Sequence, residues 1–518
     1  MSLPFQRDQH QGTAAFSGPV GIAEPGSIPS RCRTTNVKGG RVTKKVFAPC
    51  VIALLSATCL TTIASAQTSW WRTYGGTSDD GGCEVRQTSD SGYIVAGYTT
   101  VPGSSGPDLY LIKTDASGQT QWTRTHHEKV YHYGASVQQT SDSGYIIAGY
   151  EGYAAVYLVK TDASGDTLWT RTYGGAQSDY GQSVQQTLDS GYMIAGYTES
   201  FGAGRYDAYL VKTNAFGDTL WTRTYGGEYV DEGRAAQQTS DGGYIIAGFT
   251  YSFGAGTPDS ANVYLIKTNA SGDTLWTRAY GGTNDDWGKS VQQTSDGGYI
   301  IAGWTTSFGA GGYDVYLIKT NASGDTLWTR TYGGTSNDVG NSVQQTSDGG
   351  YIIAGSTMSF GAGDEDVYLI KTNALGDTLW TRTYGGTGGD EGGSVRQASD
   401  GGYIVTGRTW SFGAGNWDVY LIKTDPDGYV GIEEPLSRRP ANPTRLLVEP
   451  NPFTSVARVV GHETDVFALS DVTGRQVAIC RGDRIGVGLR PGVYFMSPMQ
   501  GDLSRHRGQA TTIIKAAY

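Results

Sequence analysis

The chain has 518 residues and a formal net charge of −10, and 77 of its residues are glycine. This glycine share is about twice the usual one and indicates many tight turns. The acidic balance argues against nucleic acid or an anionic membrane surface as a partner, so we expect no nucleic-acid binding.

The N-terminal region has the three parts of a secretory signal peptide. Lys44 and Lys45 precede a mostly apolar run over residues 46–63, and Ala64-Ser65-Ala66 supplies a small-residue cleavage site. A transmembrane anchor is the alternative, but Pro49 and several hydroxyl residues weaken it. We assign residues 42–66 to a signal peptide and expect no transmembrane anchor after cleavage. Residues 1–41 are an upstream extension, and whether they are translated is left open.

Cleavage after Ala66 changes both the charge and the cysteine content. It removes seven basic and two acidic residues, leaving 32 Lys and Arg against 47 Asp and Glu, a net charge of −15. Only Cys83 and Cys480 remain, and two scattered cysteines do not make a disulfide framework.

Residues 67–430 contain a sevenfold repeat. Its tryptophan recurs at intervals of 47 to 55 residues, at Trp70, Trp122, Trp169, Trp221, Trp276, Trp328 and Trp380. A period near 50 without a helical pattern indicates a β-propeller. One copy has strand signals at 289–293, 298–305, 314–320 and 325–332, rich in Val, Ile, Tyr, Trp and Thr. Short glycine-containing linkers join them as hairpins, so each copy predicts one four-stranded blade.

The two ends of the array complement each other. The seventh copy has strand signals at 393–397, 402–409 and 418–424 but lacks a fourth, and residues 69–76 supply a matching strand ahead of the first copy. We therefore predict an all-β fold, a seven-bladed β-propeller closed one-plus-three by the N-terminal strand. An open solenoid is the alternative, although it needs no complementary ends.

The stretch Asn321-Ala-Ser-Gly-Asp-Thr-Leu-Trp328 resembles the tryptophan-docking motif of the quinoprotein propeller superfamily. Here the Asp/Asn position lies one residue closer to the Trp, there are seven copies rather than eight blades, and no vicinal cysteine pair is present. The resemblance therefore implies the fold without the quinone, and a tryptophan that bridges neighbouring blades. We expect no cofactor, with calcium as the alternative.

The longer connections of each copy follow Tyr-Gly-Gly and contain Ser-Phe-Gly-Ala-Gly, and we expect these long loops to share one face of the ring. Two aspartates recur on this face. The first series is Asp80, Asp179, Asp231, Asp286, Asp338 and Asp390, and the second is Asp108, Asp207, Asp314, Asp366 and Asp418. Both are absent from the second copy, where His132 and Ala155 replace them, so we expect the two members of one blade to touch. Capping of backbone N–H groups is the favoured role. A hard-cation site is the alternative, with Asp286, Asp314, Asp338 and Asp366 as weak metal candidates.

Two further groups on this face are candidates for ligand binding. In the second copy, His126, His127, Glu128 and His132 replace the usual Tyr-Gly-Gly loop, and these side chains could bind a transition metal or line a ligand notch. Large aromatics also recur there, at Tyr206, Trp287, Trp304, Tyr313, Trp410 and Trp417. Aromatics beside carboxylates suit a glycan, and we select Trp287, Tyr313 and Trp417; packing of loops on themselves is the alternative.

Residues 431–447 form a linker, and residues 448–518 read as a small Ig-like β-sandwich. The elements Pro450-Asn-Pro-Phe, Asp471-Val-Thr-Gly-Arg and Gly488-Leu-Arg-Pro-Gly-Val-Tyr-Phe resemble, in this order, the C-terminal sorting domain of type IX secreted proteins. The resemblance implies export by the type IX secretion machinery, followed by release or attachment to the bacterial outer-membrane surface.

We interpret the chain as a secreted or surface-displayed monomeric binding or adhesion protein, not an enzyme, with a glycan or protein as ligand. A polysaccharide-active or glycan-binding protein and a structural repeat spacer are the alternatives. No Ser/His/Asp set, phosphate loop or unique carboxylate pair favours catalysis.

Overall fold

The computed structural model describes residues 69–101, 106–126, 132–152 and 155–431 of the repeat region. In the C-terminal part it describes residues 448–449, 458–459, 466–470, 476–481, 483–485, 492–500 and 511–515. The upstream extension, the signal peptide and residues 432–447 of the linker lie outside the described residues.

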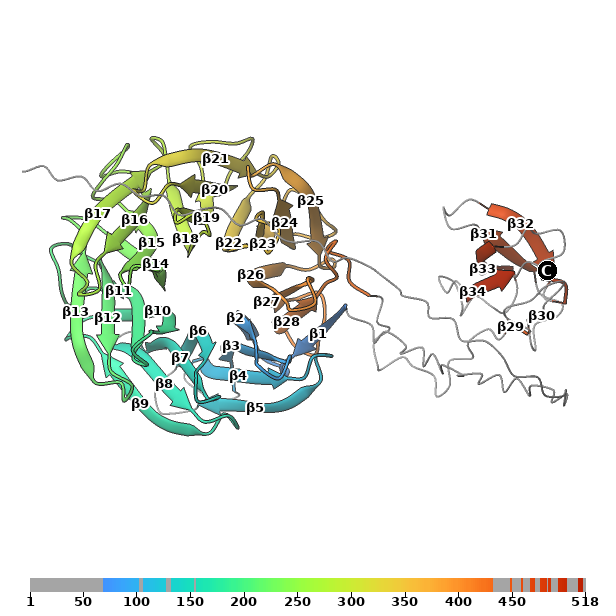
Figure 1. The fold of residues 1–518 in the computed structure, drawn as a ribbon, viewed down its shortest axis with the longest axis horizontal. Coiled ribbons are helices and arrows are strands. Elements are labelled where there is room, and N and C mark those ends of the chain that lie inside the picture. The colour runs from blue at the N-terminus through green and yellow to red at the C-terminus, as the bar shows by residue number, and fades with distance from the viewer. Residues whose placement is uncertain are drawn as a thin grey trace, which may run out of the picture. The chain divides into compact units, whose positions relative to one another are not determined.

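Seven four-stranded antiparallel sheets form a ring around a central opening (Figure 1). Blade 1 contains β2 (Asp80–Gln87), β3 (Tyr93–Thr99), β4 (Asp108–Thr114) and β5 (Thr120–His126). Blade 2 contains β6 (His132–Gln139), β7 (Tyr145–Glu151), β8 (Ala155–Thr161) and β9 (Thr167–Tyr173). Blade 3 contains β10 (Asp179–Gln186), β11 (Tyr192–Thr198), β12 (Asp207–Thr213) and β13 (Thr219–Tyr225). Blade 4 contains β14 (Asp231–Gln238), β15 (Tyr244–Thr250), β16 (Asn262–Thr268) and β17 (Thr274–Tyr280).

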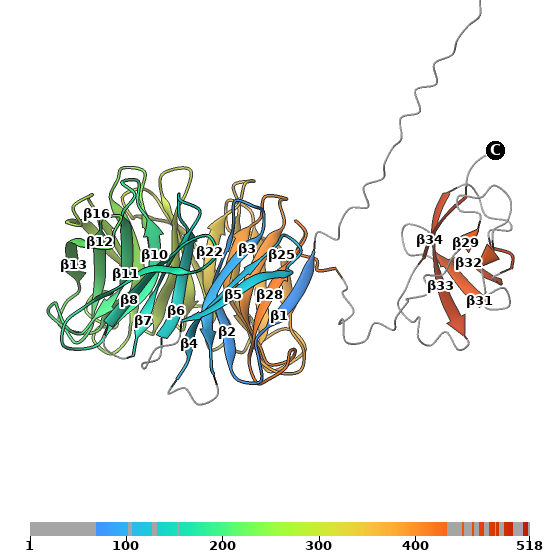
Figure 2. The same cartoon turned by 90° about the horizontal axis from the view of Figure 1, so that it is seen from below.

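The remaining blades follow the same order from the channel outward, and Figure 2 shows their strands running between the two faces of the ring. Blade 5 contains β18 (Asp286–Gln293), β19 (Tyr299–Thr305), β20 (Asp314–Thr320) and β21 (Thr326–Tyr332). Blade 6 contains β22 (Asp338–Gln345), β23 (Tyr351–Thr357), β24 (Asp366–Thr372) and β25 (Thr378–Tyr384). Blade 7 contains β26 (Asp390–Gln397), β27 (Tyr403–Thr409), β28 (Asp418–Lys423) and β1 (Trp70–Tyr74).

The predicted one-plus-three closure is confirmed. Strand β1 pairs antiparallel with β28, in register from Trp70 opposite Lys423 to Tyr74 opposite Val419. The first strand of the repeat region therefore completes the last blade, and the ring has no open edge at this seam.

Packing between successive blades supplies the core. Between blades 5 and 6, Ile300, Val315 and Leu317 pack with Val343 and Ile353 in one buried cluster. The second and third strands are buried on both faces, which explains their nearly continuous apolar sequence, whereas the outermost strand alternates between exposed and half-buried residues.

The repeated tryptophan bridges neighbouring blades, as the resemblance implied. Trp328 of blade 5 packs edge-on against Tyr351 of blade 6, with ring centroids 5.9 Å apart. The turn of blade 6 crosses this indole at Gly376, whose φ is +78° and where a Cβ atom would lie 2.8 Å from the ring. Glycine is thus required there both by the backbone conformation and by the close approach.

A buried lysine is paired with an aspartate in every blade. In blade 5, Lys319 is 3% exposed, its Nζ lies 2.9 Å from Asp296 Oδ2, and it donates a hydrogen bond to the carbonyl of Thr320. The equivalent pairs are Lys113–Asp90, Lys160–Asp142, Lys212–Asp189, Lys267–Asp241, Lys371–Asp348 and Lys423–Asp400. The pair joins the turn after the innermost strand to the third strand of the same blade.

The Gln that ends each innermost strand links its blade to the preceding one. In blade 6, Gln345 Oε1 accepts the N–H of Ser295 in blade 5 at 2.8 Å. This hydrogen bond recurs at all seven junctions, including the closing one, where Gln87 Oε1 accepts the N–H of Ser399 at 2.9 Å.

In the C-terminal part, taken by itself, the described elements are all strands. Strands β29 (Val448–Glu449) and β30 (Arg458–Val459) form a two-stranded sheet. Strands β31 (Val466–Ser470), β32 (Gln476–Arg481), β33 (Gly492–Gln500) and β34 (Thr511–Lys515) form a four-stranded antiparallel sheet in the order β32-β31-β33-β34. Across the described residues, no helix is long and apolar enough to span a membrane.

Candidate ligand-binding site at the central channel

The seven innermost strands enclose a channel with a cavity of about 290 Å³. The fourth, fifth and seventh residues of each strand line it. In most blades these are neutral polar residues, as in Gln182, Ser183 and Gln185 of blade 3. A lining of this kind can form hydrogen bonds with a polar ligand.

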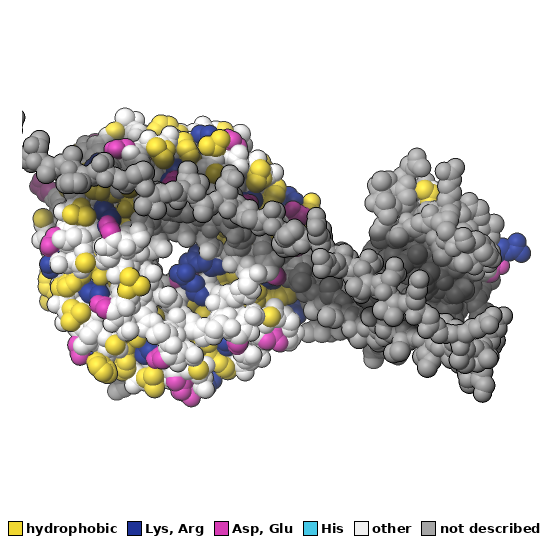
Figure 3. Space-filling model, viewed as in Figure 1, with side chains coloured by type: hydrophobic (Ala, Val, Ile, Leu, Met, Phe, Trp, Pro, Cys, Tyr) yellow, Lys and Arg dark blue, Asp and Glu magenta, His cyan; other side chains and the backbone are white. Residues whose placement is uncertain are grey.

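The charged residues of the lining are predominantly basic. Arg86, Arg234, Lys289 and Arg396 line the channel, and Glu84 is the one carboxylate among the described lining residues. Figure 3 shows basic side chains gathered at the central opening. The channel is therefore cationic, although the chain as a whole is acidic.

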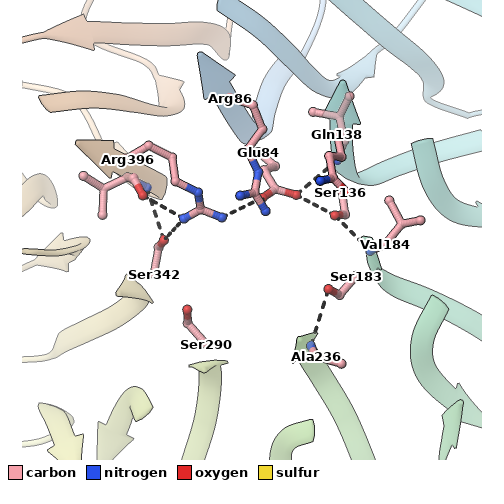
Figure 4. A network of polar contacts seen from close by, with 12 residues as sticks. Glu84, Arg86, Ser136, Gln138, Ser183, Val184, Ala236, Ser290, Ser342 and Arg396 are labelled. Atoms are coloured by element: carbon pink, nitrogen blue, oxygen red, sulfur yellow. Dashed lines mark hydrogen bonds and ion pairs between the residues drawn. The ribbon is translucent and has the colours of Figure 1, made fainter. Parts of the chain in front are cut away.

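One group of charges lies where blade 7 meets blade 1, and its carboxylate neutralises part of the positive charge of its two arginines. Glu84 Oε1 lies 2.7 Å from both Arg86 and Arg396, and its Oε2 accepts hydrogen bonds from the Ser136 hydroxyl and the Val137 N–H (Figure 4). Burial alone would raise the pKa of Glu84, but the two guanidinium groups outweigh burial and hold that pKa below its ordinary value. This cluster joins blades 1, 2 and 7 and has a structural role.

A second basic group lies on blades 4 and 5. Arg234 and Lys289 occupy the same fourth position of their innermost strands, β14 and β18. Arg234 forms an ion pair of 2.5 Å with Glu232, and its guanidinium lies 5.3 to 5.8 Å from the ring centroids of Tyr197, Phe249 and Trp287. Burial and the neighbouring Arg234 lower the pKa of Lys289 to about 8, against the opposing effect of Glu232.

An aromatic arc follows the long-loop end of the inner strands. We define it as Tyr98, Tyr133, Tyr150, Tyr180, Tyr197, Phe249, Trp287, Trp304 and Tyr313. Successive ring centroids lie 3.8 to 5.2 Å apart, and Arg234 bridges the single gap between Tyr197 and Phe249. Most of these rings remain half-buried, and Tyr313 is 39% exposed.

The predicted aromatic residues therefore fall into two groups. Trp287 and Tyr313 belong to the arc, as does Trp304. Trp417 lies instead beside blade 7, where the Arg408 guanidinium stacks on its ring at 4.3 Å and donates to the Tyr98 hydroxyl at 3.2 Å. Arg408 thus connects Trp417 to the blade 1 end of the arc.

The expectation that Asp286 and Asp314 touch is wrong. Both face Thr305, one from each neighbouring strand, so two strand spacings of about 4.8 Å separate them. Asp314 instead approaches Asp338 of the next blade, and a Cβ atom on Gly333 would lie within 2.6 Å of both carboxylates. Asp366 and its equivalents approach the first-series aspartate of the following blade in the same way. The absence of both aspartates from the second copy therefore affects two different interblade pairs.

Backbone N–H groups cap these carboxylates. Asp286 accepts from Gly282 N–H at 2.8 Å, from the Ser307 hydroxyl at 2.7 Å and from the Thr305 hydroxyl. Asp314 accepts from the N–H groups of Ala310 and Gly311. This is the capping that the sequence favoured. Burial, together with the charge of Asp338, raises the pKa of Asp314 despite its hydrogen bonds. Among the described residues, no group of three or more His, Cys, Asp or Glu could hold a metal ion.

The histidine-rich loop of blade 2 lies partly outside the described residues. His126 ends β5, the outermost strand of blade 1, and its Nδ1 lies 3.2 Å from the Thr167 hydroxyl of blade 2. His132 begins β6, the innermost strand of blade 2, whereas His127 and Glu128 are not described. The metal or ligand role of these four residues stays a prediction.

The channel cations were missed by the sequence interpretation, although a signal existed. At the fourth position the copies read Cys83, Ala135, Gln182, Arg234, Lys289, Asn341 and Gly393. At the seventh position Gln is replaced only in blades 1 and 7, by Arg86 and Arg396. An alignment of the seven copies would have shown these departures, but the face they share depends on the ring.

No protein-family model matches the chain. The regulatory protein FlaEY of Caulobacter vibrioides is 28% identical over 216 residues, which cover 36% of this chain and 21% of FlaEY. The chain thus matches about a fifth of that relative's length.

Two solved structures show similarity at the level of the fold. The Neurospora crassa Pan2 WD40 domain has a TM-score of 0.44 and 9% identity, covering 71% of this chain and 99% of that domain. PorZ, a bacterial surface component of the type IX secretion system of Porphyromonas gingivalis, has a TM-score of 0.42 and 12% identity. The match covers 86% of this chain and 60% of the PorZ chain. The chain is a seven-bladed β-propeller with a cationic channel and an aromatic arc beside it.

Proposed function

We propose that this protein is a secreted or surface-displayed binding protein whose ligand is a glycan, held where the aromatic arc meets the channel. The arc is the observation that carries this proposal. Half-buried aromatic faces stack on the C–H faces of sugar rings, and the hydroxyl and amide groups of the channel suit sugar hydroxyls.

Blade 6 argues that the arc serves more than loop packing. At the positions of Trp287 and Trp304 it carries Val339 and Ser356, and its strands keep the same register. The blade therefore forms without aromatics at these positions. Aromatics occupy both positions in blades 2, 3 and 5 and one of the two in blades 1 and 4. A row of partly exposed rings that a blade can form without favours a ligand.

A binding measurement on matched variants tests the glycan proposal. The purified protein is screened on a glycan array, and the hits are measured by calorimetry on wild type and on a Trp287→Val/Trp304→Ser variant that copies blade 6. We expect about a tenfold loss of affinity, since the variant removes two stacking rings of about 1 kcal/mol each and tenfold corresponds to about 1.4 kcal/mol.

The matched control is Phe216→Ser. Phe216 is 69% exposed in an outer turn of blade 3, and Ser271 and Ser323 stand at its position in blades 4 and 5. This control should bind like wild type. The absence of any glycan hit, with capture of a protein ligand instead, would overturn the glycan proposal.

The export part of the proposal concerns residues 448–518. It is supported by the order of the three motifs that resemble a type IX sorting domain and by the β-sheets formed in this region. Removing residues 448–518 should leave the propeller in the periplasm of a type IX-competent host, as fractionation would show. Normal export of the truncated protein would contradict the assignment.

A further inference from the structure

We infer that the channel recognises a carboxylate on its ligand, with Arg234 and Lys289 as the anion-binding residues, so that the ligand is an acidic glycan containing uronic acid. This inference rests on the proposed glycan-binding function and adds the chemical class of the sugar.

The charges around Lys289 leave it available. Glu84 is engaged by Arg86 and Arg396, and Glu232 is engaged by Arg234. No hydrogen bond or ion pair joins Lys289 Nζ to any residue that the structure describes, and the Arg234 Nε–H is buried without a partner among the same residues. Two neighbouring cations thus have one nearby carboxylate, which pairs with Arg234, and an additional anion would balance the charge of Lys289.

The surroundings of this pair select a sugar acid over a bare ion. Lys289 Nζ lies 5.5 Å from the centroid of the Trp287 ring, so the anion site adjoins the aromatic arc. Gln182 and Asn341 stand at the equivalent positions of blades 3 and 6, and the channel lining also includes Ser183 and Ser290. An arginine and a lysine bind a planar carboxylate, amides and hydroxyls bind the ring hydroxyls, and the indole stacks on the sugar.

The size of the cavity agrees with such a ligand. A volume of about 290 Å³ is at the lower end of small-molecule pockets. It accommodates a terminal sugar residue, while the rest of an oligosaccharide extends along the arc.

The experiment compares acids with their neutral esters. Mono-, di- and trisaccharides of galacturonic, glucuronic and mannuronic acid, and their methyl esters, are titrated into the full protein by calorimetry. We expect at least one acid to bind ten or more times more tightly than its ester, and the preference to decrease with salt.

Substitutions that copy other blades test the two residues. Lys289→Gln and Arg234→Gln each introduce the residue that blade 3 carries as Gln182, so the strand should be preserved. Each should abolish the preference for the acid over its ester. Arg205→Gln, which removes an exposed charge from a loop of blade 3, should retain the preference. Affinity for the acid should also decrease from pH 7 to 9 in wild type, because Lys289, flanked by Arg234 and Glu232, loses its proton, and this decrease should be absent in Lys289→Gln.

The outcomes separate this inference from the function on which it rests. If acid and ester bind equally, or if Lys289→Gln keeps the preference, the carboxylate inference is overturned while glycan binding stands. If no sugar binds, neutral or acidic, both are overturned. A preference lost in Lys289→Gln and Arg234→Gln but kept in Arg205→Gln supports the inference.

Discussion

At the scale of single residues, the lysine–aspartate pairs show how this repeat tolerates a charge in its core. Lys319 is buried, whereas the side chain of Asp296 is 56% exposed, so one partner stays hydrated while it neutralises the other. Asp296 also accepts hydrogen bonds from Thr294 and Gly298 in its own turn. The same carboxylate thus orders the turn and pairs with the core cation.

Replacing Asp296 with Asn should separate these two roles. The amide oxygen can keep the turn hydrogen bonds, but Lys319 would lose its counter-charge. We expect a loss of about 2 kcal/mol in the free energy of unfolding by urea, less than for a fully buried pair because Asp296 is solvated. The control Asp325→Asn, in an exposed pair with Arg278, should cost under about 0.5 kcal/mol. Equal effects would contradict a special role for the buried pair.

The same pairs predict sensitivity to acid. Hydrogen bonds from lysine and threonine outweigh burial and lower the pKa of Asp90, Asp241, Asp296 and Asp348 to about 2. A carboxyl with a lower pKa in the folded state stabilises the fold above its unfolded pKa, near 4, and loses this contribution as the pH falls towards 2.

The interblade aspartates act in the opposite direction over this range. The pKa values of Asp207, Asp314 and Asp418 are raised by burial and by the facing aspartate, so their protonation favours the folded state. Because the paired aspartates are more numerous, we expect a net decrease in the urea midpoint between pH 4 and pH 2. A midpoint that rises on acidification would mean that the interblade carboxylates dominate.

At the scale of elements, strand β1 is the critical one. It supplies the outer edge of blade 7, and Trp70, which is 2% exposed, packs edge-on against Tyr93 of blade 1 with ring centroids 5.9 Å apart. The sequence predicted this strand correctly because the seventh copy lacked its fourth strand. Turns of the Ser-Asp-Gly-Gly type were equally predictable, because glycine readily adopts positive φ. In the structure the first glycine of these turns has φ near +80°.

Deleting residues 69–76 should therefore open blade 7. We expect a much lower melting temperature, measured by calorimetry, and aggregation through the exposed edge of β28, measured by light scattering. A circular permutant that places residues 69–76 after residue 431 provides the control, because it restores four strands to blade 7. Melting of the deletion variant at the wild-type temperature would show that β1 does not hold the ring closed.

At the scale of the whole molecule, the ring determines which residues become neighbours. Asp314 meets Asp338 across a blade junction, and the carboxylates are capped by backbone N–H groups and separated by Gly333. Capping needs no cation, whereas a calcium site would neutralise the repulsion between the two carboxylates.

Thermal denaturation with and without calcium distinguishes these two cases for all the interblade pairs together. We expect the melting temperature to be unchanged by millimolar calcium and by chelator, because backbone capping does not depend on metal. An Asp314→Asn variant, which copies Asn262 of blade 4, should behave in the same way. A calcium-dependent rise of several degrees that is reversed by chelator would instead show metal linked to the folded state.

The sequence by itself determined the number of blades, the strands within each blade and the closure, because periodicity and hairpin turns are local properties of a repeat. It also identified Trp287, Tyr313 and Trp417 as separate candidates. Only the tertiary structure decided that Trp287 and Tyr313 lie in one arc, that Arg234 and Lys289 face a common channel, and that the aspartates pair between blades. These relations join residues of different copies, and the distance between two copies is set by how the blades pack around the ring.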